Sequence, residues 1–206
     1  IDGAVNNDVF GLAGSGTNGG QIGVNPISID AIESFQVNVA PFDVRQSGFT
    51  GASIDAVTKS GTNEFKGTVY GFYRNENLTG GKIKGEDVFK PSLSQNQYGV
   101  SIGGPIIKNK LFFFANFEKD EVTELGSSFI PNTGSGAINE SRVLESDLKL
   151  VSNILSQVSI GNGEFYNTGD YQGFTYGASS TKGLFKLDYN INENHRMSLI
   201  YNFLRA

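Results

Sequence analysis

Cysteine and tryptophan are missing from this 206-residue chain, and its only histidine is His195. Without cysteine there can be neither disulfides nor thiolate metal sites, and one histidine excludes a histidine-rich cluster. Basic residues are also in the minority: 16 Lys and Arg against 21 Asp and Glu give a net charge of −5. Because nucleic-acid backbones are bound by basic surfaces, we expect no nucleic acid partner, and no metal or cofactor.

Long apolar runs are missing too, so no segment reaches the roughly 18 residues of a transmembrane helix. The mean hydropathy of −0.22 resembles that of a soluble protein, but a barrel strand shows lipid only every second residue, which hides it from such an average. No signal peptide is visible, and the chain begins with Ile1 rather than Met. We therefore expect Ile1 to be a cut or processed end.

Glycine and aromatic residues are plentiful, with 27 glycines and 12% Phe and Tyr, a composition that favours β structure. The first 30 residues are rich in glycine, and we interpret them as a folded loop. Residues 14–20 lack the Gly-Lys-Ser/Thr ending of a phosphate-binding loop. Two short strands are predicted next, at residues 34–40 and 52–59.

Five later segments alternate apolar and polar residues with the period of a β-strand. They are residues 65–74, 97–104, 110–118, 183–189 and 196–203. Their connections are alternately long (75–95, 119–181) and short (105–109, 190–195), as in outer-membrane barrels with long extracellular loops and short periplasmic turns. Aromatic residues toward the strand ends fit the girdles of such barrels. The pattern favours a transmembrane β-barrel, although alternation alone also fits a soluble antiparallel sheet with one buried face.

Five strands cannot close a single-chain barrel, and barrels leave no free edges in lipid. We therefore expect two further kinds of partner besides the membrane lipid. One is the remainder of the same barrel. The other is a different outer-membrane protein that holds the segment.

The long connection at 119–181 carries two further patterns. Apolar residues spaced by 4, 3, 4 and 3 positions predict one short amphipathic helix that ends near Gly161; they are Leu144, Leu148, Val151, Leu155 and Val158. We interpret this helix as packing on its own loop, with a partner-binding helix as the alternative. The aromatic residues Tyr166, Tyr171, Phe174 and Tyr176 follow it. They could form a platform for a substrate or could pack the loop down.

Specific strings resemble the TonB-dependent receptors of outer membranes. Residues 32–37 (IESFQV), 48–54 (GFTGASI) and 57–62 (VTKSGT) resemble the end of the plug domain of that family, with Ala52 and Asp55 in place of its usual Gly and Asn. Residues 103–114 (GGPIIKNKLFFF) are similar to the first periplasmic turn and third strand of the Oar-like branch, which is found in Bacteroidota and relatives. Residues 187–196 resemble the next turn in that branch.

This resemblance implies a mainly β fold in which residues 1–63 are the C-terminal part of a plug domain. Residues 64–206 would be the first five strands of a transmembrane β-barrel in the Gram-negative outer membrane. It also implies a transporter energised by TonB, ExbB and ExbD through a segment upstream of Ile1; energised export of a cargo stays open as a variant. A surface protein without transport, such as an adhesin or an assembly component, is the alternative.

Catalysis is not expected, because His195 lies in a polar turn without a nucleophile motif. Charged residues in the plug-like segment and on the predicted lumen face are more informative. Polar contacts can exchange for water at modest cost, which suits a plug that must be held and yet moved. We expect Arg45 and Lys59 to pair with wall carboxylates, with Glu118 as a wall contact; solvated surface charge is the alternative.

The loop lengths predict the orientation of the chain. Residues 75–95 and 119–181 should lie outside the cell, and residues 105–109 and 190–195 in the periplasm. Protease added to intact cells should therefore cut first within 119–181, as mapped by mass spectrometry of the released peptides. A first cut within 190–195 would reverse the topology.

Overall fold

A computed structural model of the chain describes residues 1–8, 16–39, 52–87, 89–137 and 139–206. These residues divide into two compact units. The first comprises residues 1–73, 95–121 and 178–206, and the second comprises residues 74–94 and 122–177. The described part of the chain is mainly β, with antiparallel pairing predominant and a single α-helix, which confirms the predicted fold class at this level.

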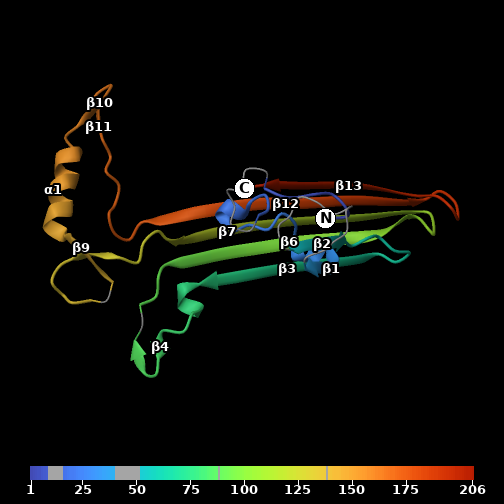
Figure 1. The fold of residues 1–206 in the computed structure, drawn as a ribbon, viewed down its shortest axis with the longest axis horizontal. Coiled ribbons are helices and arrows are strands. Elements are labelled where there is room, and N and C mark those ends of the chain that lie inside the picture. Colours follow the sequence, from blue (N-terminus) through green and yellow to red (C-terminus); the bar gives the residue numbers. More distant parts are fainter. Residues whose placement is uncertain (9–15, 40–51, 88, 138) are drawn as a thin grey trace. The chain divides into compact units, whose positions relative to one another are not determined.

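A five-stranded sheet forms most of the first unit, and its strands lie side by side in the order β13-β12-β7-β6-β3 (Figure 1). The strands are β3 Lys66–Asn75, β6 Leu93–Ile107, β7 Leu111–Leu125, β12 Thr175–Asn190 and β13 Arg196–Arg205. Spatial order thus follows chain order. Each alternating segment of the sequence corresponds to one of these strands, because a period of two places every second side chain on the same face.

Three of the strands are longer than the alternation predicted, with 15 residues in β6, 15 in β7 and 16 in β12. In β7 the added residues begin with Lys119, Asp120 and Glu121, so both faces are polar there. Backbone hydrogen bonds continue without apolar alternation; for example, the Leu125 amide donates to the Ser92 carbonyl at 2.9 Å. The connection predicted at 119–181 therefore begins later and ends earlier, at residues 126 and 174.

Two short turns join neighbouring strands of the sheet at the same end. In the turn between β6 and β7, Asn109 has a positive φ of 62°, a conformation that asparagine tolerates better than most residues. In the turn between β12 and β13, the Asn192 side chain accepts hydrogen bonds from the amides of Asn194 and His195 at 3.0 and 2.8 Å. The Asn190 amide donates to the Lys110 carbonyl at 2.7 Å, which links the two turns.

The plug-like segment forms a small antiparallel sheet of its own. Its strands are β1 Ile32–Val39 and β2 Ala52–Thr58, which pair with Phe35 opposite Ala56. Short 3-10 helices precede them at η1 Gly20–Ile22 and η2 Ile29–Ala31. The N-cap residue of η2 is Ser28.

In the five-stranded sheet the buried face is polar and the exposed face is apolar, which is the reverse of a sheet in a soluble protein. Polar and charged side chains are buried on one face: Ser101, Asn116, Glu118, Ser180, Lys182 and Lys186. Large apolar side chains are exposed on the other: Val69, Val100, Ile102, Phe117, Phe185, Met197, Leu199 and Tyr201. In a water-soluble protein the apolar face would be buried, whereas a membrane barrel presents its apolar face to lipid.

The second unit carries short elements around one helix. These are η3 Glu76–Leu78, β4 Lys82–Ile83, β5 Glu86–Asp87, β8 Ile130–Asn132, β9 Glu140–Leu144, α1 Glu145–Leu155, β10 Ser159–Gly161 and β11 Glu164–Phe165. Helix α1 occupies the stretch that the apolar spacing predicted. No helix in the described ranges is long and apolar enough to cross a membrane.

A carboxylate closes the loop before β9 in this second unit. Glu140 accepts hydrogen bonds from the amides of Thr133, Ser135 and Gly136 at 2.9–3.0 Å and from the hydroxyls of Thr133 and Ser135. These bonds, the Thr133 amide first among them, lower the pKa of Glu140 to about 2 because they favour the ionised form. The ionised Glu140 therefore keeps these hydrogen bonds at neutral pH, and the loop loses them only as the pH falls toward that pKa.

The connection from β2 to β3 lies against the backbone of the five-stranded sheet. A Cβ added to Gly61 would lie 2.7 Å from the Gly104 carbonyl oxygen and 2.9 Å from the Phe113 amide nitrogen. Backbone atoms of a paired strand cannot move aside as a flexible side chain can. Position 61 therefore requires glycine.

Gly61→Ala should destabilise the full-length protein, by about 1–3 kcal/mol as for other overpacked sites. Gly80→Ala is the control, because a Cβ at Gly80 meets nothing within 4 Å. Thermal unfolding of the purified proteins, followed by circular dichroism, measures both. Equal melting temperatures for the two variants would contradict the close approach at Gly61.

Candidate functional site

The candidate site is the contact between the described part of residues 1–58 and the polar face of the five-stranded sheet. Its apolar part in these residues is small: Ile27 and Ala31 from the segment pack with Phe114 of β7 and Leu184 of β12, and Ile1, Ile32 and Ile200 lie partly buried against them. Burying so few apolar side chains contributes only a few kcal/mol, at about 25 cal/mol per Å². Hydrogen bonds and charges therefore form much of the attachment between the segment and the sheet.

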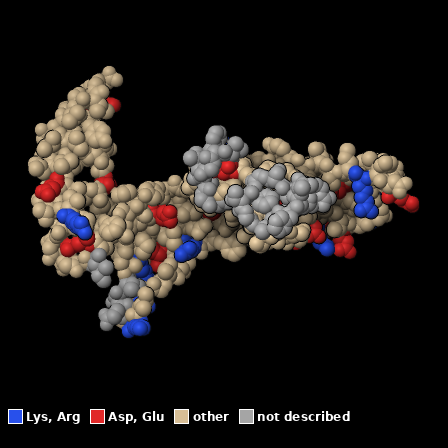
Figure 2. Space-filling model, viewed as in Figure 1, with Lys and Arg blue, Asp and Glu red and all other residues tan. Residues whose placement is uncertain are grey.

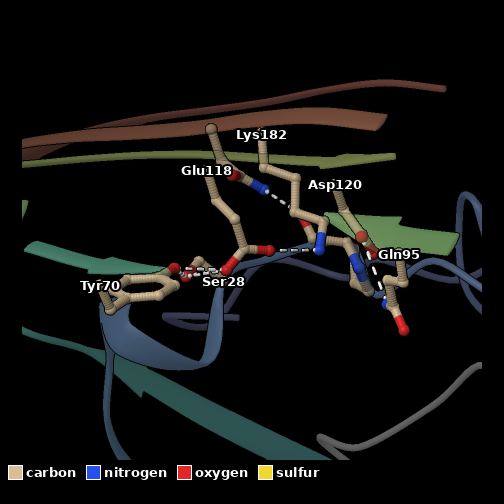
Figure 3. A network of polar contacts seen from close by, with 8 residues as sticks. Ser28, Tyr70, Gln95, Glu118, Asp120 and Lys182 are labelled. Carbon is tan, nitrogen blue, oxygen red and sulfur yellow. Dashed lines mark hydrogen bonds and ion pairs between the residues drawn. The ribbon is translucent and has the colours of Figure 1, made fainter. Parts of the chain in front are cut away.

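Glu118 is the centre of the first polar cluster, which Figure 3 shows. Its Oε1 accepts a hydrogen bond from Lys182 Nζ of the neighbouring strand β12 at 2.7 Å, and both side chains are more than nine-tenths buried. Its Oε2 accepts from Ser28 Oγ at 2.8 Å and also from the Tyr70 hydroxyl of β3. One wall carboxylate thus connects two other wall strands with the plug-like segment.

Lys186 is the centre of a second polar cluster. It lies four residues further along β12 than Lys182 and on the same face of the sheet. Its Nζ donates to the carbonyl oxygen and the hydroxyl oxygen of Thr58, both at 3.2 Å. Asp2 Oδ1 lies 4.0 Å from the same nitrogen. Asp2 in turn accepts from the Thr58 amide at 2.9 Å and from its hydroxyl at 2.7 Å.

Arg45, Lys59 and Glu118 are the residues predicted as plug–wall contacts, and their surroundings differ. Lys59 lies 3.2 Å from Asp30 Oδ1, a carboxylate of the plug-like segment itself rather than of the wall. The reason is local: η2 brings Asp30 beside the end of β2, where the Lys59 amide also donates to the Ala31 carbonyl. Glu118 lies on the wall and contacts the segment through Ser28. Arg45 lies outside the described residues.

The predicted loop aromatics lie in the second unit. The rings of Phe174 and Tyr176 contact each other with centroids 6.1 Å apart, and the Tyr176 hydroxyl donates to the Gly126 carbonyl at 3.0 Å. These two contacts are of the kind that packs a loop down. Tyr166 and Tyr171 are exposed, so a substrate contact by these two side chains stays a prediction.

Sequence reasoning missed five of the residues that build the site: Asp2, Ser28, Thr58, Tyr70 and Lys182. The alternation could have identified Lys182, since it precedes Lys186 by four positions on the same strand face. Tyr70 could have been identified in the same way, since it follows Thr68 by two positions. Asp2, Ser28 and Thr58 carry no local pattern, because their partners are distant in the sequence. No group of three or more His, Asp or Glu residues in the described ranges could hold a metal ion.

Charges of both signs are interspersed on the face of the molecule that Figure 2 shows.

The first comparison with known proteins concerns the class of the fold. Residues 57–133 match the family described as Outer membrane beta barrel domain. That range runs from the end of β2 through β3, β6 and β7. This match and the exposed apolar face of the sheet make the chain similar to outer-membrane β-barrel proteins.

A particular relative narrows this class. The chain is 35% identical over 112 residues to the TonB-dependent transporter Oar of Myxococcus xanthus, and the alignment covers 50% of the chain and 11% of that protein. No solved structure matches the chain. The two matches confirm the predicted resemblance to Oar-like TonB-dependent receptors and the location in the outer membrane.

Removing the central carboxylate should expose how much the first cluster contributes. Glu118→Ala leaves Lys182 as a buried, uncompensated charge and should destabilise the full-length protein by about 3–5 kcal/mol. Glu121→Ala on the same strand is the matched control: its half-exposed pair with Lys119 should contribute less than about 1 kcal/mol. Urea unfolding in detergent measures both values, and similar losses would show that burial of Glu118 is unimportant.

Proposed function

We propose that this chain is the junction between plug and wall of a TonB-dependent outer-membrane transporter. Residues 1–63 form the C-terminal part of the plug, and residues 64–206 form the first five strands of the wall. The complete barrel moves a substrate through the passage that the plug occupies, and TonB with ExbB and ExbD supplies the energy. The remainder of the barrel and the membrane lipid are the other partners.

One observation carries this proposal: among the described residues, the plug-like segment lies against the polar face of the sheet without pairing to any of its strands. Strands β1 and β2 pair with each other, while Ser28, before β1, contacts Glu118 and Thr58, the last residue of β2, contacts Lys186. A surface β-protein such as an adhesin would more simply extend one sheet, with β1 paired to the edge strand β3. A separate body over a polar face is what a plug inside a barrel requires.

The second support comes from the other face of the sheet. Its exposed apolar side chains include Val100 at 42%, Phe117 at 40% and Leu199 at 59% of their full exposure. Exposing such a face to water is unfavourable, at about 25 cal/mol per Å², whereas lipid solvates it without that cost. The polar face then lines the lumen, where charged residues are tolerated.

The third support is the chemistry of the interface. A plug must stay in place at rest and yet leave its position during transport. Hydrogen bonds to water replace those of Ser28 and Thr58 when the interface opens, so the net cost is about 1.5–3 kcal/mol for each bond, because each has one charged partner. A large apolar interface would offer no such exchange. The name of the Myxococcus relative, a TonB-dependent transporter, agrees with a movable plug.

Ion conductance of the full-length protein in planar lipid bilayers tests the plug assignment. The intact protein should be closed, and a variant without residues 1–60 should open a steady pore. A deletion of similar length within residues 126–174 is the control and should leave the pore closed. A closed pore in the variant without residues 1–60, with the wall folded by circular dichroism, would contradict the assignment.

A further inference from the structure

We infer that the plug segment is attached to the wall in two different ways, one permanent and one releasable. Residues 61–64 stay on the wall when residues 1–59 detach, and Lys186 is the positioning residue whose charge opposes that detachment. This inference rests on the proposed function and adds which contacts break and which persist.

The permanent attachment is built from backbone and from a reciprocal pair of asparagines. Gly61 lies against the backbone of Gly104 and Phe113, which leaves no room for a side chain. Two residues later, Asn63 Nδ2 donates to Asn109 Oδ1 at 2.6 Å, and the Asn109 amide donates back to Asn63 Oδ1 at 2.8 Å. The linker is therefore fixed to the β6–β7 turn independently of the plug.

The Glu118 cluster contributes little to holding the segment. The charge of Glu118 is compensated within the wall by Lys182 at 2.7 Å, and Tyr70 of the wall donates a further hydrogen bond. When Ser28 departs, Glu118 loses one neutral donor and keeps its ion pair. Water can replace a single hydroxyl at modest cost.

Lys186 differs from Lys182 in where its partners lie. In the described ranges, the side-chain hydrogen-bond and ion-pair partners of its ammonium group are Thr58 and Asp2, both in residues 1–58. The residue is 6% exposed, so its charge is shielded from water while the segment is bound. Departure of the segment removes all three of these oxygen contacts together and leaves a charge beside Lys182 on the same strand face.

Asp2 makes this attachment cooperative. Its carboxylate holds the amide and the hydroxyl of Thr58, and its own amide donates to the Ala56 carbonyl at 2.8 Å. The beginning of the segment and the end of β2 therefore leave Lys186 as one piece. Lys59 belongs with this piece, since it contacts Asp30 and Ala31, whereas Gly61 is the first residue that lies against the backbone of the sheet.

Urea-dependent opening of the full-length protein in planar bilayers tests the inference, because urea weakens polar and apolar contacts of the plug and no substrate is needed. Lys186→Glu places a carboxylate beside Asp2 and should lower the urea concentration at half-maximal conductance by about 1 M. Lys66→Glu, with the same charge change on the wall strand β3, is the matched control and should leave that concentration unchanged. An unchanged midpoint for Lys186→Glu, or equal shifts in both variants, would overturn the role of Lys186.

Cross-links test which part moves, and the chain has no cysteine of its own. A bifunctional thiol reagent joining Asn63→Cys to Asn109→Cys should leave urea-dependent opening intact. The same chemistry joining Ser28→Cys to Tyr70→Cys should abolish it, with each variant compared before and after cross-linking. Opening blocked by the first cross-link, or permitted by the second, would overturn the division between residues 59 and 61. If wild-type protein never opens below the urea concentration that unfolds the barrel, the plug assignment itself fails.

Discussion

The rest of this structure depends on the burial of charge on one face of a single sheet. Lys182, Lys186 and Glu118 could not be buried against an apolar layer, because an unpaired charge in such surroundings costs several kcal/mol. They require a partner that brings hydrogen-bonding groups, and residues 1–58 bring Ser28, Thr58 and Asp2. The opposite face has no such requirement and carries apolar side chains instead. Under the proposed function, this one asymmetry decides which face meets the plug and which meets lipid.

Glycines allow this sheet to be covered closely by aromatic rings. Tyr70 lies over Gly99, Phe65 over Gly104 and Phe203 over Gly183, since a Cβ at each glycine would overlap the facing ring. Such cross-strand pairs protect a strand position that has no side chain of its own. Tyr70 gains a second role on the lumen face, where Gly99 leaves space for its ring to bring the hydroxyl to Glu118.

The strands of the five-stranded sheet could be predicted from the sequence, whereas most residues of the candidate site could not. The reason is physical. Alternation of apolar and polar residues is a local property, and it located β3, β6, β7, β12 and β13 as separate strands. It failed at the ends of β6, β7 and β12, where pairing continues through backbone hydrogen bonds with polar residues on both faces. The predicted helix in the long connection corresponds to α1 because its apolar spacing is equally local.

Contacts between segments far apart in the chain have no local pattern. The predicted pairing of Lys59 with the wall illustrates this, since Asp30 was closer in space as well as in sequence. Glu118 was identified as a wall contact only because its lumen orientation followed from the alternation; its partner Ser28 is 90 residues away. Lys186 and Thr58, 128 residues apart, could be paired only once the fold was known.

The extended ends of β6, β7 and β12 have a consequence for how such a protein can diversify. Their added residues are held by main-chain hydrogen bonds, which do not depend on side-chain identity, so these positions tolerate substitution. Insertions or deletions beyond these added residues leave the register of the apolar strands unchanged. The part of the chain predicted to face the environment can therefore change its composition and length freely, while the part that must fit both lipid and plug stays under constraint.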